Sequence, residues 1–348
     1  MKSFDEKYLK KLIVPHHLIT VIRQIGEYRG KQELFKKQAP EMLENLRHVA
    51  MIQSTESSNR LEGITADIKR IKELVEEKTA PANRTEGEIA GYRDVLNTIH
   101  MNYRNIPFTP NIVLQLHRDM TKYSGREGGK WKSAANEISE ILPNGTKRIR
   151  FVPVDPHLTP EHMRILHERY ASLEKDQVLD PLILIPLYIL DFLCIHPFLD
   201  GNGRMARLLT VLLLYHNNYE VARYISLERI VEHTKESYYE TLFKSSQGWH
   251  KSRHNVFPWT EYFLSTIIAA YQEFENRLGR ISSGHGSKTD MVLNAIDAFI
   301  GDFNISDLER ACPSVGRDWI RKLLQKLKHE GKVHVSGKGR FAKWQKVQ

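Results

Sequence analysis

The chain has 348 residues, with 51 Lys and Arg against 42 Asp and Glu, and therefore a formal net charge of +9. Because 41% of the residues are hydrophobic and 27% are charged, the composition is that of a folded protein of two or three domains and excludes wholesale disorder. The only two cysteines, Cys194 and Cys312, have no partner motif, which excludes a disulfide framework and a cysteine-ligated metal site.

The first third of the chain has the periodicity of helices. Apolar residues recur at three- and four-residue spacing from Pro15 to about His100, with breaks expected at Pro40 and at residues 80–83. Further helices are expected over residues 89–103 and up to about Lys122.

Between residues 124 and 160 the helical period disappears. Residues 147–154 alternate in the manner of a strand and follow the turn sequence Pro143-Asn144-Gly145. This region therefore predicts a β-hairpin.

Two strongly apolar segments, residues 181–195 and 208–215, predict buried central helices. The first contains Pro186 and Asp191 and is too short to span a bilayer, and the N-terminal residues lack the apolar stretch of a signal peptide. We therefore expect a soluble, cytoplasmic protein with no membrane partner. Other helices are expected over residues 160–173, 237–244 and 259–278.

The last sixty or so residues form a separate predicted unit, which follows a flexible linker at residues 279–287. The expected order is a helix, a short helix capped by Ser306, a helix capped by Ser314 and a two-stranded hairpin, which is the order of a winged helix-turn-helix. These elements correspond to residues 290–300, the Ser306 segment, residues 317–329, and strands 333–335 and 341–344.

This C-terminal unit is basic. Residues 286–348 contain twelve Lys and Arg against seven Asp and Glu, a net charge of +5. Three interpretations are open: the unit binds DNA, it serves as a module for protein contacts, or it only presents a solvated basic face. In the DNA-binding interpretation, Arg317 and Arg321 face the groove, and Lys338 and Arg340 contact the backbone.

One polar segment separates the two apolar helices. It reads His196-Pro197-Phe198-Leu199-Asp200-Gly201-Asn202-Gly203-Arg204-Met205-Ala206-Arg207. Placing so many polar groups between core helices is costly unless they are used. Pro197 ends the first helix, and the glycines allow a sharp turn before Arg204 opens the next helix.

The residue types in this segment suit phosphate transfer. Free N–H groups at a helix N-terminus form an anion site, and Arg204 and Arg207, three residues apart, can both address a polyphosphate. Asp200 can hold a Mg²⁺ that bridges phosphates, and His196, with an ordinary pKa of about 6.5, can accept a proton from an attacking hydroxyl. The alternative is a glycine-rich turn with surface arginines.

At this segment the chain resembles the Fic family, whose signature is H-x-F-x-[D/E]-G-N-G-R-x-x-R. Every specified position is matched, by His196, Phe198, Asp200, Gly201, Asn202, Gly203, Arg204 and Arg207. The resemblance implies a mainly α fold: a Fic-type helical core with a β-hairpin flap, an N-terminal helical region and a C-terminal winged helix-turn-helix. It also implies a protein adenylyltransferase, in which a Ser, Thr or Tyr hydroxyl attacks the α-phosphorus of ATP and pyrophosphate leaves.

The resemblance also implies a role for each signature residue. His196 would be the base and Asp200 the Mg²⁺ ligand. The α- and β-phosphates would lie on Gly201, Asn202 and Gly203, and the outer phosphates on Arg204 and Arg207.

Two further segments resemble parts of the family. Residues 129–153 correspond to its flap, which holds a target by strand pairing, and the expected docking residues are Lys132, Arg150, Phe151 and Val152. Lys132 stands where an arginine is common, which keeps the charge but weakens bidentate contacts. Tyr238 and Tyr239 resemble the aromatic residue that lines the adenine pocket, and a core role is the alternative for either.

A second motif lies upstream. Ser58 and Glu62 are one helical turn apart, within a Ser-x-x-x-Glu-Gly pattern. Fic proteins with an N-terminal inhibitory helix carry such a motif, and the resemblance implies that Glu62 pairs with Arg207 and keeps ATP in an unproductive pose. The alternative is a solvated helix face.

The implied domains are an N-terminal helical region (1–110) with the inhibitory helix near 54–63, a catalytic core (111–278), the linker (279–287) and the winged helix (288–348). Expected partners are ATP, a protein target that could be the chain itself, and DNA through the winged helix. A homodimer is left open. Two other functions remain open: a DNA-binding regulator that uses the Fic unit as a nucleotide sensor, and a de-AMPylating hydrolase in which Glu62 orients water.

Overall fold

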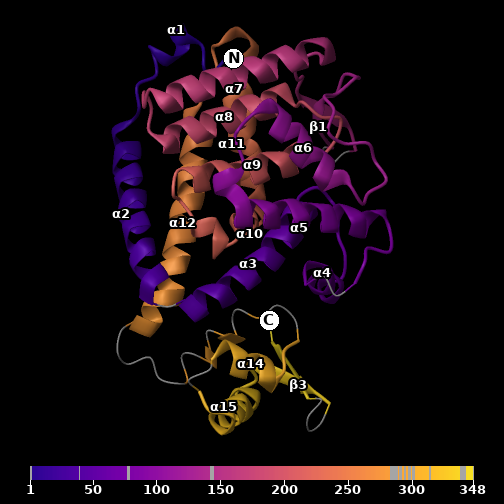
Figure 1. Cartoon of the computed structure of the whole chain (residues 1–348), viewed down its shortest axis with the longest axis vertical. Helices are drawn as coiled ribbons and strands as arrows, with labels where there is room; N and C mark the ends of the chain where they lie inside the picture. The colour runs from indigo at the N-terminus through magenta and orange to yellow at the C-terminus, as the bar shows by residue number, and fades with distance from the viewer. Residues whose placement is uncertain are drawn as a thin grey trace.

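The computed structural model describes residues 2–38, 40–76, 79–141, 145–282, 302–312, 315–337 and 342–347, together with positions 289, 292, 293, 295, 296 and 299. The described chain is mainly helical, with two small antiparallel hairpins. Figure 1 shows a helical body and a smaller C-terminal unit beyond one end of it. Among the described residues, no helix combines the length and the apolar composition needed to cross a membrane.

The helical body agrees with the predicted helices in most positions. Its elements are α1 (Glu6–Leu9), α2 (His16–Gln38), α3 (Pro40–Arg60), α4 (Ile68–Val75), α5 (Arg84–Asn102), α6 (Pro110–Thr121), β1 (Ile138–Ile141), β2 (Lys147–Phe151), α7 (Thr159–Lys175), α8 (Pro181–Ile195), α9 (Asn202–His216), α10 (Leu227–His233), α11 (Lys235–Ser246) and α12 (Phe257–Ser282), with short 3-10 turns between some of them.

The two central helices form the middle of the core. The predicted helix over 181–195 is confirmed as α8, and every residue from Leu182 to Ile195 is buried. The helix expected over 208–215 begins six residues earlier, because Gly201 adopts a left-handed conformation (φ 80°) and serves as the N-cap of α9.

Asp191 is buried inside α8, and the surrounding hydrogen bonds explain how the core tolerates it. Its carboxylate accepts hydrogen bonds from the Ser3 hydroxyl (2.5 Å), the Ser3 backbone N–H (3.2 Å) and Trp249 Nε1 (2.5 Å). Burial raises the pKa of Asp191 to about 6. The carboxylate thus ties the N-terminal segment and the Trp249 turn to the central helix.

Close packing of α3, α5 and α6 places these helices next to the signature segment. A Cβ atom at Gly87 or Gly91 of α5 would collide with backbone carbonyls of Tyr123 or Met120, so α5 and the end of α6 approach more closely than larger residues allow. Helix α3 packs on α5, α9 and α10, and Ser54 donates a hydrogen bond to Ser226 at the start of α10 (2.9 Å).

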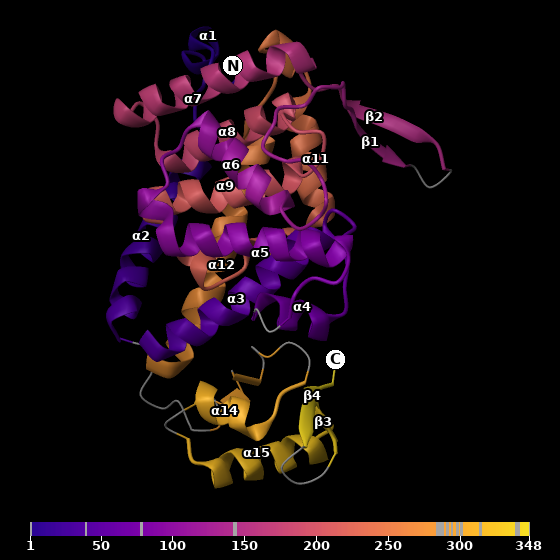
Figure 2. The same ribbon diagram turned by 45° about the vertical axis from the view of Figure 1, so that its right-hand side comes forward.

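The first hairpin pairs β1 with β2 and projects from the body, as Figure 2 shows. Ser139 lies opposite Ile149, and the register shifts by a bulge between Ile138 and Ser139. The predicted strand over 147–154 ends at Phe151, before Pro153. Of the predicted turn, residues 143 and 144 lie outside the described residues.

The C-terminal unit contains α14 (Ile305–Ala311), α15 (Arg317–His329), β3 (Val333–Ser336) and β4 (Lys343–Lys346). The predicted cap at Ser306 is wrong: Asn304 caps α14 in a reciprocal capping box with Asp307. The last strand begins two residues later than expected. The helix over 290–300 falls largely outside the described residues, as do Ser314, Lys338 and Arg340, so the winged helix stays a prediction.

Candidate active site

The signature segment forms a rigid turn between α8 and α9. His196 ends α8 in the left-handed region (φ 52°, ψ 61°), which a residue with a side chain adopts only when its surroundings hold it there. The Asn202 side chain accepts a hydrogen bond from Phe198 N–H (2.9 Å) and donates one to Phe198 C=O (2.7 Å). These bonds direct the side-chain amide to Phe198, and the main-chain N–H of Asn202 lies in the first turn of α9, where it can face a phosphate.

The start of α9 has the features of an anion site. Gly201 provides no side-chain cap, so the first N–H groups of the helix have no acceptor within the helix, and the positive end of the helix dipole lies here. A Cβ atom at Gly203 would fall on the carboxylate of Glu62. Glu62 therefore lies directly against the surface that these N–H groups form.

Arg207 is held by Ser58, in the last turn of α3, and by Glu62, which lies two residues beyond it, because the helix expected near 54–63 ends at Arg60. Arg207 Nε donates to Ser58 Oγ (2.8 Å), and its Nη2 donates to Ser58 O (2.9 Å) and to Glu62 Oε1 (2.7 Å). Burial disfavours the charged guanidinium, but the Glu62 carboxylate together with Tyr238 and Tyr92 outweighs this effect, so the pKa of Arg207 is raised. Nη1 is buried, has no partner among the described residues, and lies beside Gly203.

Arg204 is bound by a different carboxylate. Its Nη1 lies 3.0 Å from Glu88 Oε2 on α5 and donates a longer hydrogen bond to Asn59 on α3 (3.4 Å). Arg204 Nε is also buried without a partner in the described part of the chain. Burial lowers the pKa of Arg204. Each signature arginine thus keeps one free N–H group although each is paired with a carboxylate.

His196 is poised as a proton acceptor. Its Nδ1 lies 3.2 Å from the carbonyl of Leu193, and a carbonyl can only accept, so the proton of the neutral ring belongs on Nδ1 and Nε2 is free. Burial lowers the pKa of His196 to about 4, and the Lys132 ammonium acts in the same direction, whereas Glu62 opposes it. The ring is therefore neutral at physiological pH.

Lys132 binds backbone carbonyls of the signature turn. It lies before β1, outside the hairpin on which we expected it. Its ammonium is buried, contacting Ile195 O (3.0 Å) and Asn136 Oδ1 (2.8 Å), and its N–H donates to Pro197 O (2.8 Å). Burial lowers its pKa to about 8. A cation at this position stabilises the C-terminus of α8.

Asp200 faces outward at the rim of the turn. Its side chain is 54% exposed and forms an ion pair with Arg126. Among the described residues, no group of three or more His, Cys, Asp or Glu could form a metal site by itself. A single exposed carboxylate fits Mg²⁺ that is completed by phosphate oxygens and water, and does not fit a metal held by protein alone.

The two tyrosines lie in different surroundings. Tyr238 is buried against Trp259 and Tyr262, with ring centroids 5.6 and 5.8 Å apart, so it belongs to the core. Tyr239 is 40% exposed, donates to Leu61 O (3.3 Å), and borders an open hollow of about 520 Å³ between the end of α3, β2 and α11. Of the pair, Tyr239 is the one that a nucleoside could reach.

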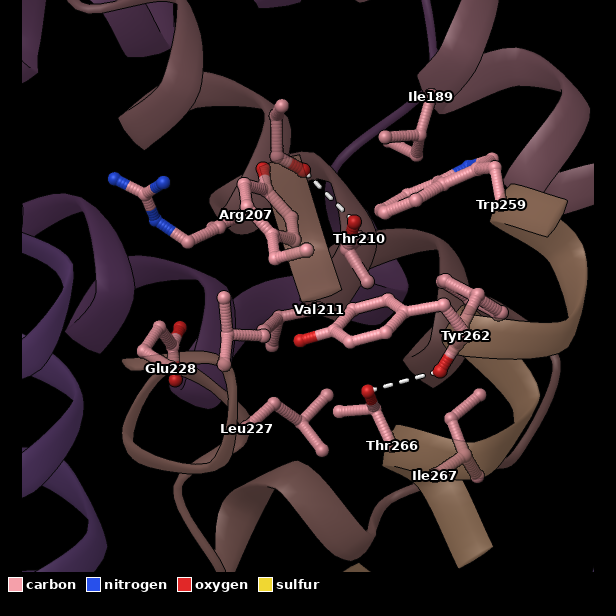
Figure 3. A pocket seen from close by; sticks show the side chains of 14 residues that line it. Ile189, Arg207, Thr210, Val211, Leu227, Glu228, Trp259, Tyr262, Thr266 and Ile267 are labelled. Carbon is pink, nitrogen blue, oxygen red and sulfur yellow. Dashed lines mark hydrogen bonds between the residues drawn. The ribbon is translucent and has the colours of Figure 1, made fainter. Parts of the chain in front are cut away.

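A small cavity of about 40 Å³ lies behind Arg207, and its lining is mostly aliphatic and aromatic. Figure 3 shows the guanidinium of Arg207 pointing away from this cavity, while Trp259 and Tyr262 lie on the opposite side. The cavity is therefore a packing space of the core and no phosphate site.

The residues expected to dock a target on the flap differ in how far their side chains are exposed. Arg150 is mostly buried, pairs with Glu140 (2.9 Å) and Glu240 (3.2 Å), and anchors the hairpin to α11. Phe151 stacks on His250 (5.2 Å). Val152 is 59% exposed, and its carbonyl lies 2.8 Å from His250 Nε2. Of these three, only Val152 exposes its side chain fully enough to meet a target.

Sequence reasoning missed several residues of the site. They are Asn59, Glu88, His117, Arg126 and Asn136, which come from α3, α5, α6 and the loop after α6. No spacing links them to the signature, because they lie 60 or more residues away in the chain. The glycines around residue 125–129 were the only local signal.

The segment that contains this site is similar to known proteins. Residues 107–214, which include the whole turn and most of α9, match the Fic/DOC family. The chain is also similar to proteins named protein adenylyltransferase Fic, with 24% identity over 207 residues in Nematostella vectensis and 25% over 224 residues in Drosophila melanogaster.

These matches cover 57% and 63% of the chain, and the chain spans less than half of either relative (44% and 40%). A crystal structure of a Fic family protein from Desulfovibrio desulfuricans superposes over 97% of both chains, with a TM-score of 0.61 at 19% identity. The fold of this chain is therefore also found in that solved structure along nearly the whole length of both chains.

Proposed function

We propose that the chain is an autoinhibited protein adenylyltransferase, which transfers AMP from ATP to a Ser, Thr or Tyr hydroxyl of a protein. The observation that supports it most is the buried, unpartnered Nη1 of Arg207 beside Gly203, at the uncapped start of α9. A buried donor without an acceptor is costly, and a phosphate oxygen would satisfy it.

In the proposed reaction the target hydroxyl oxygen attacks the α-phosphorus of ATP, and its proton passes to Nε2 of His196. The bond between the α-phosphorus and the bridging oxygen breaks, and pyrophosphate leaves. The N–H groups of Asn202 and Gly203 stabilise the charge on the phosphates, and Arg204 and Arg207 hold the outer ones. Asp200 and the phosphate oxygens would hold Mg²⁺, which would neutralise phosphate charge.

The proposed brake is Glu62. Its side chain is 31% exposed, so it lies at the edge of the site. Because it occupies Arg207 Nη2 and the face of Gly203, an incoming outer phosphate would meet a carboxylate where it needs a cation. ATP would then bind displaced, with its α-phosphorus away from His196.

The experiment that tests this proposal is intact-mass spectrometry of the Glu62→Gly variant after incubation with ATP and Mg²⁺, with a cell lysate added in a parallel sample containing labelled ATP. We expect a mass gain of one AMP or transfer of the label to lysate protein, and neither in the Glu62→Gly, His196→Ala double variant. A folded Glu62→Gly variant that transfers nothing in either sample would refute the proposal.

A second function is favoured by the surface of α15. Trp319, Lys322, Lys326 and His329 follow one face of this helix and are exposed, with Arg321 and Lys328 beside them. Trp319 is 45% exposed. A cationic helix face with an exposed aromatic suits the backbone of duplex DNA, so the C-terminal unit would place the enzyme on nucleic acid.

Retention of the full chain on duplex DNA tests this second function. We expect binding that weakens steeply with salt and is lost in the Lys322→Glu, Lys326→Glu variant. The matched control is Lys7→Glu, Lys175→Glu, which reverses two exposed charges on the helical body. Equal loss in both variants would point to net charge alone and contradict a specific surface.

A further inference from the structure

We propose that His117 is a positioning residue of the phosphate site: it fixes the peptide between Asp200 and Gly201 and so orients the Asp200 carboxylate and the start of α9. His117 lies on α6, 83 residues before Asp200 in the chain, and is buried. The inference rests on the proposed nucleotide-binding function and concerns how the turn is held.

The hydrogen bonds of His117 assign both nitrogens of its ring. Nδ1 lies 3.0 Å from the N–H of Gly129, which can only donate, so Nδ1 carries a lone pair. Nε2 lies 3.1 Å from the carbonyl of Asp200, which can only accept, so Nε2 carries the proton. The imidazole is therefore a fixed bridge between the loop after α6 and the signature turn.

Ring packing holds this bridge in place. The His117 ring stacks on Phe198 with centroids 3.7 Å apart and planes only 6° from parallel. Gly201 favours this turn through its backbone, whose φ of 80° lies in the left-handed region that side chains rarely adopt. A Cβ atom there would lie in ordinary contact with His117 Nε2 (3.6 Å) and would displace only the flexible end of Met120.

The hydrogen bond from His117 to Asp200 O also sets the orientation of the peptide group that joins Asp200 and Gly201. Because the peptide between Asp200 and Gly201 is planar, fixing its C=O on His117 also fixes the direction of the Gly201 N–H. That N–H donates to Oδ1 of Asp200 (2.6 Å) and so holds the carboxylate. The second carboxylate oxygen is held by Arg126, whose loop His117 also binds at Gly129.

Two substitutions separate the two bonds of the imidazole. A glutamine amide nitrogen reaches the position of Nε2, so His117→Gln keeps a donor for Asp200. An asparagine oxygen reaches the position of Nδ1, so His117→Asn keeps an acceptor for Gly129 and loses the bond to Asp200. If positioning of the signature turn is what matters, glutamine should rescue function and asparagine should not.

The test is calorimetric binding of ATP, with and without Mg²⁺, in the Glu62→Gly background, with the melting temperature measured in parallel. We expect His117→Asn to weaken binding about three- to tenfold, the value of one buried hydrogen bond, and His117→Gln to stay near the parent. His167→Phe is the control, since His167 is another buried histidine with bonds to Met163 and Tyr188, outside the site.

The outcomes are distinct. Equal ATP affinity in the parent, His117→Asn and His117→Gln would overturn the inference. It would also be overturned if the loss of ATP affinity in His117→Asn, His117→Gln and His167→Phe simply followed the loss of melting temperature. A Glu62→Gly parent that binds no ATP would instead contradict the proposed function.

Discussion

The carboxylate of Glu62 lies 2.7 Å from Nη2 of Arg207 and at the same time covers the face of Gly203. One side chain therefore blocks both the cation and the backbone surface of the proposed phosphate site. Ser58 contacts the same arginine through its hydroxyl and its carbonyl, but neither of these groups carries a net charge. The negative charge opposing a nucleotide at Arg207 thus comes from Glu62.

We predict that Glu62→Gln raises AMP transfer at least about fivefold, because the amide keeps the size of the side chain but removes its repulsion of a phosphate. The measurement is the initial rate of label transfer from ATP. Glu44→Gln is the matched control, since Glu44 lies on α3, upstream of Glu62, is 70% exposed and pairs with Arg47. A rate equal to that of Glu44→Gln would show that charge is not the basis of the brake.

The hydrolase alternative has a different readout. Release of AMP from pre-modified protein by the wild type, lost in Glu62→Gln, would favour it.

Ser58→Ala, made in the Glu62→Gly background, should raise the KM for ATP about tenfold. The alanine leaves Arg207 Nε without its partner, and a hydrogen bond to a charged group is worth about 1.5–3 kcal/mol. The neighbouring Ser57→Ala serves as the control, because Ser57 is buried but its hydroxyl does not contact Arg207. An unchanged KM would indicate that other groups orient the arginine.

The rate of transfer should be nearly constant from pH 6 to 8. The neutral form of His196 is the active one, and burial lowers its pKa to about 4, so the acidic fall in rate should lie near that value. The same shift affects stability. Between about pH 4 and 6.5 the unfolded chain binds the extra proton, so this contribution falls as pH falls and is complete above 6.5. A half-maximal rate near pH 6.5 would contradict the prediction.

Chelation of divalent metal should stop transfer, and Asp200→Asn should raise the Mg²⁺ requirement about tenfold. Asparagine keeps the hydrogen bond from Gly201 N–H but has no charge for a hard cation. The readouts are the Mg²⁺ dependence of the rate and Mn²⁺ binding in the presence of ADP. Asp119→Asn is the control, since Asp119 is exposed and faces Arg118. Equal requirements in the two variants would remove Asp200 from the metal site.

Asp191→Ala should lower the free energy of unfolding by about 3 kcal/mol, because Trp249 Nε1 and Ser3 would lose a buried acceptor. Asp191→Asn keeps an acceptor oxygen and should cost much less. Burial raises the wild-type pKa to about 6, so the wild type should lose stability relative to Asp191→Asn as pH rises from about 4 to 6. Urea unfolding across this range measures both effects, and parallel curves would contradict the second.

Several features of the site could be read from the chain alone, since they depend on neighbours in sequence. The apolar run over 181–195 predicted a buried helix, and the glycines at 201 and 203 predicted a turn before the next helix, which begins at Asn202. Helix periodicity also predicted that Ser58 and Glu62 face the same way. In the structure α3 ends at Arg60, before Glu62, but both side chains contact Arg207. The caps were harder: Asn304 and Ser306 are both good cap residues, and the hydrogen bonds with Asp307 decide between them.

Sequence by itself determined the signature and its residue types, because these lie in twelve consecutive positions. Only the tertiary structure decided which partners hold them. Glu88 on Arg204, His117 on Asp200 and Lys132 beneath His196 come from separate elements, and their positions depend on how α3, α5 and α6 pack. Packing also divided residues that sequence treats alike, burying Tyr238 and exposing Tyr239. Burial and distance are properties of the folded chain, and they set the pKa of His196 and the pairing of Arg207.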